Sequence, residues 1–201
     1  MPAALTPFDR VGLLRPAVDA HTLGLTALAQ LLEDCGHRAV LADAALAGHL
    51  NDPDTPDARD ALAAWIRAHG VTVLGFSYRL DPQDGLRLAA RLVHALKQRR
   101  LFAPLGGPIR ALYFAGLPAA CEQVQRQVPE VAGVFQGDET PAETLARLGV
   151  DPGRIPRELA EGVRYDDDRL AFGRDLVRRE AHLSVGPVSR AGYPEFGTAR
   201  D

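Results

Sequence analysis

An aspartate and a histidine two residues apart, Asp19 and His21, are the residues of this sequence best suited to metal chemistry. They follow a short apolar run, 11–14, and precede Gly24 and an amphipathic run, 25–35. A histidine in such a loop can offer one ring nitrogen to a metal while a nearby carboxylate holds the other. The same spacing also fits a capped turn with a surface histidine, so this stretch alone leaves both interpretations open.

The elements that must position this loop alternate between strands and helices. Such alternation with short connections predicts an α/β fold, a flavodoxin-like (Rossmann-like) five-stranded parallel sheet in the order 2-1-3-4-5. Residues 43–56 read as a loop because they contain a cluster of breaker residues at 51–56. We expect strands at 9–15, 38–42, 71–76, 101–105 and 131–135, and helices near 25–35, 57–70, 83–98, 118–128 and from Pro141 onward.

The first 149 residues account for one complete unit of this fold, and residues 150–201 differ from them in character. The pattern predicts short helices at 155–161 and 165–183, followed by a stretch rich in glycine and proline. We therefore expect a domain at 1–149 and a linker or extension at 150–201, which could begin or dock onto a catalytic partner.

The composition of the chain argues against some kinds of binding partner and favours one cellular compartment. The net charge is −3, which does not favour a nucleic-acid surface. The two cysteines, Cys35 and Cys121, form neither a disulfide framework nor a CxxC motif, so a cytoplasmic location is expected. The N-terminus lacks the pattern of a signal peptide, and no apolar run approaches the roughly 20 residues that span a bilayer.

Two further motifs stand at expected strand ends. The third strand leads into Ser77-Tyr78-Arg79-Leu80, and the expected fourth strand leads into Gly106-Gly107. In the order 2-1-3-4-5, strands one, three and four are neighbours, and ligands bind at their carboxyl ends. All three motifs would then face one crevice.

Asp-x-His-x-x-Gly, a serine at a strand end and Gly-Gly, in this order, resemble the signature of the cobalamin-binding domain. That family includes the corresponding domains of methionine synthase, methylmalonyl-CoA mutase, glutamate mutase and corrinoid methyltransferases. The resemblance covers roughly residues 9–149, and Gly137-Asp138-Glu139-Thr140-Pro141 is similar to the turn before the last helix in the small subunit of glutamate mutase.

The resemblance implies that His21 is the lower axial ligand of cobalt and that Asp19 holds its other ring nitrogen. The displaced nucleotide tail would lie in a slot between the sheet and a helix, where glycines allow close approach and Ser77 contacts the buried base. Arg79 departs from the family pattern, which usually has leucine there. The residues expected to contact cobalamin are Asp19, His21, Thr22, Gly24, Ser77, Tyr78, Arg79, Leu80, Gly106, Gly107, Gly137, Glu139, Thr140 and Pro141.

The resemblance further implies a module that presents adenosylcobalamin or methylcobalamin to a separate catalytic subunit or domain, such as a TIM barrel. A mutase similar to glutamate mutase and a methyltransferase share these motifs, so both stay open. Two other classes also stay open. One is a sensor that uses adenosylcobalamin, and the other is a flavodoxin-like domain that binds no cobalamin.

Overall fold

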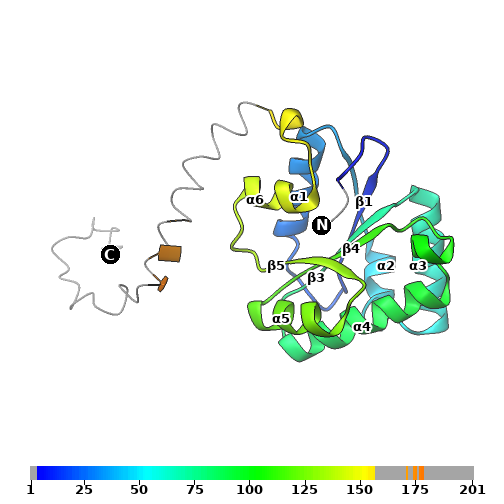
Figure 1. Ribbon diagram of the computed structural model, residues 1–201. Helices are drawn as coiled ribbons and strands as arrows, with labels where there is room; N and C mark the ends of the chain where they lie inside the picture. Colours follow the sequence, from blue (N-terminus) through cyan, green and yellow to red (C-terminus); the bar gives the residue numbers. More distant parts are fainter. Residues whose placement is uncertain (1–3, 157–170, 172–173, 176, 179–201) are drawn as a thin grey trace, which may run out of the picture.

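One parallel sheet forms the centre of the computed structural model, which describes residues 4–156, 171, 174–175 and 177–178 (Figure 1). Its order is β2-β1-β3-β4-β5, which confirms the expected flavodoxin-like topology. Most of each expected helix, at 155–161 and at 165–183, lies outside the described residues, and the described residues 155 and 156 are not helical. The strands are β1 (Arg10–Leu14), β2 (Arg38–Leu41), β3 (Val73–Tyr78), β4 (Ala111–Gly116) and β5 (Val131–Phe135).

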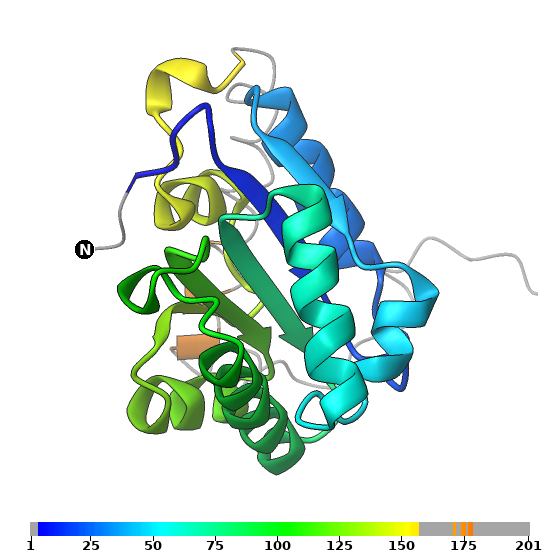
Figure 2. The ribbon, with the colours of Figure 1, turned by 90° about the vertical axis from the view of Figure 1, so that its right-hand side faces the viewer.

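Helices cover both faces of this sheet (Figures 1 and 2). Alternate strand residues point to opposite faces, so Leu13 packs under α1 and α6 whereas Leu14 packs under the other four helices. No helix in the described part of the chain is long and apolar enough to cross a membrane. The helices are α1 (Leu23–Asp34), α2 (Ala44–His49), α3 (Pro56–His69), α4 (Pro82–Gln98), α5 (Pro118–Gln127) and α6 (Pro141–Leu148), with short 3₁₀ turns at Ala103–Leu105 and Pro152–Arg154.

The segment 43–56 was expected to be a loop, but its first half forms α2. Asp43 caps this helix by accepting a hydrogen bond from the Leu46 backbone N–H, and Leu46 and Leu50 are buried beneath it. An N-cap aspartate followed by small helix-forming residues explains the helix. The breaker cluster ends the helix and separates it from α3.

The fourth strand lies about ten residues later in the chain than expected, at Ala111–Gly116 rather than 101–105. Residues Ala103–Leu105 form a 3₁₀ turn, and Gly106 ends it with a φ of 85°. Leu101 and Phe102 are buried, but Phe102 makes only an isolated bridge with Ile109. Their apolar character therefore reflects core packing after α4 and not membership of the sheet. Gly106 and Gly107 consequently precede β4 instead of following it.

The amino-terminal edge of the sheet is tied together by a buried carboxylate, Asp9. The Arg110 guanidinium donates to both of its oxygens at 2.6 Å, and the hydroxyls of Thr72 and Thr6 each donate at 2.7 Å. Burial alone would raise the pKa of Asp9, but these hydrogen bonds outweigh it and hold that pKa well below its usual range. Because Asp9, Thr72 and Arg110 directly precede β1, β3 and β4, this network fixes the three strands relative to one another.

A second buried titratable group, His37, makes stability depend on pH. Burial and the nearby Arg154 lower the pKa of His37, against smaller opposing effects of Thr6 and Asp9. Below pH ~6.5 the unfolded chain binds a proton that the folded chain resists, so the free energy of unfolding falls as the pH drops. We expect His37→Leu to flatten this fall, measured as thermal midpoints between pH 7.5 and pH 5.

The exposed His49 at the end of α2 provides the matched control. His49→Leu should keep the pH dependence of the parent protein. A His37→Leu protein whose midpoint falls as steeply with pH as that of the parent would contradict the assignment.

Candidate functional site

Asp19 and His21 meet in the loop between β1 and α1. The Nδ1 of His21 lies 2.6 Å from Oδ1 of Asp19, and the His21 backbone N–H donates to the same oxygen at 3.0 Å. Asp19 is fully buried, whereas the His21 side chain is 57% exposed. A carboxylate that accepts the proton of Nδ1 leaves Nε2 as the ring nitrogen with a lone pair. The arrangement therefore exposes Nε2, a nitrogen that can bind a metal, on a ring that the buried Asp19 carboxylate holds in place.

The other oxygen of Asp19 connects this loop to β3. Its Oδ2 accepts a hydrogen bond of 2.7 Å from the backbone N–H of Arg79, the first residue after that strand. Each oxygen of the buried carboxylate thus contacts a different loop, Oδ1 the loop after β1 and Oδ2 the loop after β3. The two loops cannot shift independently without breaking one of these bonds.

Three further contacts hold the β1–α1 loop in place, and none was expected from the sequence. The guanidinium of Arg15 donates to the carbonyl of Asp19 at 2.6 Å. The backbone N–H of Val18 donates to the Asn51 side chain, and that of Ala17 donates to the carbonyl of Ala47. Part of the breaker cluster therefore supports the site from below. No local pattern marks the last two of these contacts, because they join residues that are 33 and 30 positions apart in the chain.

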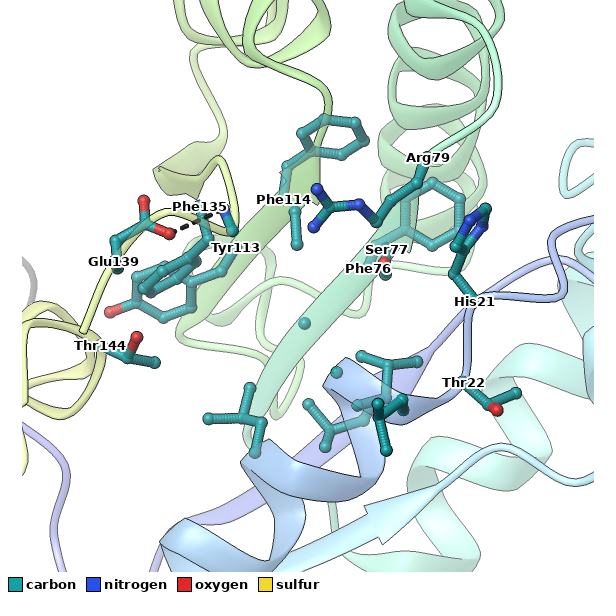
Figure 3. A pocket seen from close by; sticks show the side chains of 18 of the residues that line it. His21, Thr22, Phe76, Ser77, Arg79, Tyr113, Phe114, Phe135, Glu139 and Thr144 are labelled. Carbon is teal, nitrogen blue, oxygen red and sulfur yellow. Dashed lines mark hydrogen bonds between the residues drawn. The ribbon is translucent and has the colours of Figure 1, made fainter. Parts of the chain in front are cut away.

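A cavity of about 780 Å³ opens beside His21, between the sheet and the two helices α1 and α6 (Figure 3). Its floor consists of alternate residues of β1 and β3, among them Leu13, Gly75 and Ser77, which face the same side of the sheet. Leu25 and Leu28 of α1 form one wall, and α6 forms the opposite wall. Small-molecule sites typically have volumes of about 300–1,000 Å³, so this space suits a ligand rather than a single water.

The far end of the cavity is aromatic. The rings of Tyr113 and Phe135 lie 5.9 Å apart at an interplanar angle of 53°, and Thr144 of α6 lines the space beside them (Figure 3). Burial raises the pKa of Tyr113, which keeps its phenol neutral at physiological pH. These three residues were not among those expected at the site from the sequence, where aromatic packing was the favoured role for Tyr113. Assigning β4 correctly would have placed Tyr113 on the same face as Ser77 and Gly75.

Arg79 spans the opening between the end of β3 and the loop after β5 (Figure 3). Its guanidinium donates to the carbonyl of Gln136 at 3.3 Å and rests against Gly137, where a Cβ would overlap Nη1. Gly137 also has a φ of 84°, a conformation that favours glycine. Glu139 accepts hydrogen bonds from the backbone of Gln136 and Gly137 and so fixes this loop.

The structure brings together about half of the residues expected at the site. Those that line the cavity are His21, Thr22, Gly24, Ser77, Arg79, Gly137 and Glu139. A Cβ at Gly24 would meet no atom within 4 Å, so this position opens directly onto free space. Asp19 supports His21 from beneath, as expected.

Four other expected residues lie outside the lining of the cavity. Tyr78 packs on the opposite face of the sheet, in the core beneath α4, and Leu80 is exposed beyond the end of β3. Thr140 is buried as the N-cap of α6, where it forms a capping box with Glu143, and Pro141 is the first residue of that helix. Their positions are explained by local structure.

Gly106 and Gly107 were expected beside His21, and this expectation is wrong. They precede β4 and therefore lie at the opposite edge of the sheet. A Cβ at Gly107 would overlap the backbone of Leu101, so this glycine serves the turn. The residue that ends β4 at the cavity edge is Gly116, where a Cβ would come within 2.9 Å of the Tyr78 carbonyl oxygen.

The arrangement can hold one metal ion through a single imidazole, next to space for an organic group. Within the described residues, no group of three or more histidine, cysteine, aspartate or glutamate side chains is placed to hold a metal. The chain matches no protein-family model and has no significant match among curated proteins.

Proposed function

We propose that this protein binds cobalamin in the base-off, His-on mode, with Nε2 of His21 as the lower axial ligand of cobalt. The observation that carries the proposal is the position of one imidazole. It is held by the buried carboxylate of Asp19 and stands at the opening of a slot of about 780 Å³. A metal ligand beside an organic-sized slot suits a metal that belongs to a larger organic cofactor.

The slot has the chemistry that a displaced nucleotide base would need. It is lined mainly by apolar and aromatic side chains, and its polar groups include the hydroxyls of Ser77 and Thr144. Aromatic rings such as those of Tyr113 and Phe135 stack favourably with planar bases. When bound, the cobalt would supply organometallic chemistry on its upper face, and this chain would orient and hold the lower face.

Apolar side chains surround His21 on the outside of the protein. Val18 and Leu23 are 57% and 83% exposed, and Leu80 is also exposed. An exposed apolar surface of this kind favours contact with a large ligand or with a second protein. We infer a cofactor-carrying module that works with a catalytic partner, either a mutase or a methyltransferase, in the cytoplasm.

The protein could instead use adenosylcobalamin as a sensor, or be a flavodoxin-like domain that binds no cobalamin. If the protein binds cobalamin, the flavodoxin-like domain that binds no cobalamin is ruled out. A sensor would bind the cofactor but would not need a partner that supplies a substrate site, so copurification of a barrel enzyme would favour the mutase or methyltransferase role.

The direct test is to add cobalamin to the purified protein and to identify the nitrogen bound to cobalt. After reduction to cob(II)alamin, the electron paramagnetic resonance spectrum shows splitting by the axial nitrogen. Labelling the protein with ¹⁵N should change that splitting from a triplet to a doublet, because the ligand nitrogen then comes from the protein. Retention of the triplet, or passage of the cofactor through a desalting column without retention, would reject the proposal.

Asp19→Asn should weaken this binding by about 10- to 100-fold, the usual effect of losing a partner that orients a metal-bound histidine. Asparagine has one acceptor oxygen, whereas Asp19 uses both of its oxygens for His21 and Arg79. Cobalamin titrations followed by visible absorbance would measure the change. Asp54, whose carboxylate lies 3.8 Å from the exposed His94, supplies the control. Asp54→Asn should leave the affinity unchanged, and equal losses in both variants would contradict the role of Asp19.

A further inference from the structure

The charged side chains that line the slot differ in whether they have a partner of opposite charge. Apart from the neutral phenol of Tyr113, three lining residues carry ionisable groups, and two of these have a carboxylate or a basic partner. His21 is paired with Asp19, and Glu139 lies 2.7 Å from Arg147 while accepting two backbone hydrogen bonds. Arg79 is the third, and it forms no ion pair with any residue in the described part of the chain. Among the described residues, its side chain donates one hydrogen bond, to the Gln136 carbonyl at 3.3 Å.

An arginine in this state has unused capacity for an anion. The guanidinium carries five N–H donors in a planar fork that matches two oxygens of a phosphate or carboxylate. Most of these donors are unused by described residues, and the side chain is only half-buried, so an anion at the opening can reach it. Leu117, which also lines the slot, has an apolar side chain and offers no competing charge.

The position of Arg79 matters as much as its charge. It lies between His21, where the metal would be held, and the aromatic end of the slot (Figure 3). A group that connects a metal at His21 to a base near Tyr113 can therefore run past the guanidinium. In a nucleotide tail, the connecting group is a phosphodiester, which is an anion.

We propose that Arg79 binds the phosphodiester of the ligand's nucleotide tail and so makes the slot selective for corrinoids that carry this phosphate. The inference rests on the proposed function, because it assumes that a corrinoid is the ligand. Gly137 contributes to this arrangement, because a side chain at position 137 would displace the Arg79 guanidinium from the opening. On binding, Arg79 exchanges its weak bond with the Gln136 carbonyl for charge-assisted hydrogen bonds to phosphate.

Comparing three corrinoids separates the contribution of the phosphate to binding from that of the rest of the ligand. Cobinamide lacks the nucleotide, cobinamide phosphate carries the phosphate alone, and cobalamin carries the complete tail. A hydrogen bond to a charged group contributes about 1.5–3 kcal/mol, which corresponds to roughly a 10- to 150-fold change in affinity. Arg79→Leu should therefore weaken cobalamin and cobinamide phosphate by about 10-fold or more and leave cobinamide unchanged. Dissociation constants from fluorescence quenching or calorimetry, with the full-length protein, would measure this.

The substitutions can be matched closely. Arg79→Leu keeps the backbone N–H that donates to Asp19, so the loop that supports His21 retains its contact. Arg79→Gln keeps a polar side chain without the charge and provides a second variant if the leucine protein folds poorly. Arg87→Leu is the control, because Arg87 is an exposed arginine on α4 that pairs with Asp84.

The outcomes distinguish this inference from the proposed function. If the parent protein retains cobalamin but Arg79→Leu weakens all three corrinoids equally, Arg79 contacts the corrin or shapes the loop, and the phosphate assignment is wrong. No change in any affinity would also overturn it. If the parent protein does not bind cobalamin at all, the proposed function fails and this inference fails with it.

Discussion

His21→Ala is expected to abolish ligation of cobalt by the protein. Nε2 of His21 is the nitrogen that the structure presents outward beside the slot, with Nδ1 engaged by Asp19. Because loss of an orienting partner alone costs about 10- to 100-fold in metal affinity, loss of the ligand itself should cost more than about 100-fold. The ¹⁵N-dependent splitting in the cob(II)alamin spectrum should disappear, and the remaining bound cofactor should lack a protein nitrogen.

His94 on α4 provides a close control for this substitution. Its side chain is 53% exposed, against 57% for His21, and it also lies near an aspartate. His94→Ala should retain the parent spectrum and affinity. A His21→Ala protein that still shows splitting from a protein nitrogen would require another ligand and would reject the site.

Asp9→Asn is expected to have the largest effect on stability, at the edge of the sheet farthest from His21. The substitution leaves the Arg110 guanidinium without the carboxylate that it contacts through two hydrogen bonds. Removing one partner of a buried ion pair costs about 3–5 kcal/mol, because the other charge stays in a poorly solvated position. Urea unfolding at pH 7 would measure the loss in the free energy of unfolding.

The exposed pair of Asp84 and Arg87 on α4 supplies the comparison. Asp84→Asn should cost at most about 1 kcal/mol, as is usual for surface ion pairs. Asp9→Asn protein that remains folded should bind cobalamin normally, because the network lies at the amino-terminal edge and the slot at the other. A loss of less than about 1 kcal/mol would show that the network contributes little.

The sheet order and the loop carrying His21 could be predicted because the information is local. Short apolar runs separated by capped helices determine the alternation, and a polar loop after the first strand places Asp19 and His21 at its carboxyl end. The third strand ended close to Ser77, as its β-branched pattern predicted. The parallel arrangement then dictates that these two loops are neighbours.

The fourth strand was misplaced because apolar runs report burial rather than sheet membership. Leu101 and Phe102 are as buried as strand residues, and the glycines after them imitate a strand end. The start of β4 depends on a contact between residues far apart in the chain. Arg110 donates a hydrogen bond to Asp9 across the sheet, and this contact helps to fix where β4 begins. Because of the same error, Tyr113 was missing from the predicted site. The face of the sheet toward which the Tyr113 side chain points depends on the register of β4 with β3.

The two oxygens of Asp19 have a consequence for how ligand binding is distributed over the protein. One oxygen orients the imidazole and the other anchors the backbone of Arg79, so the groups proposed to hold the two parts of the ligand share one rigid support. In thermodynamic terms, the two interactions are linked, and their free energies should not simply add. A corrinoid with a complete tail would therefore gain cooperativity that neither the cobalt nor the phosphate provides alone. Selectivity for the whole cofactor would arise from this coupling through a single buried side chain.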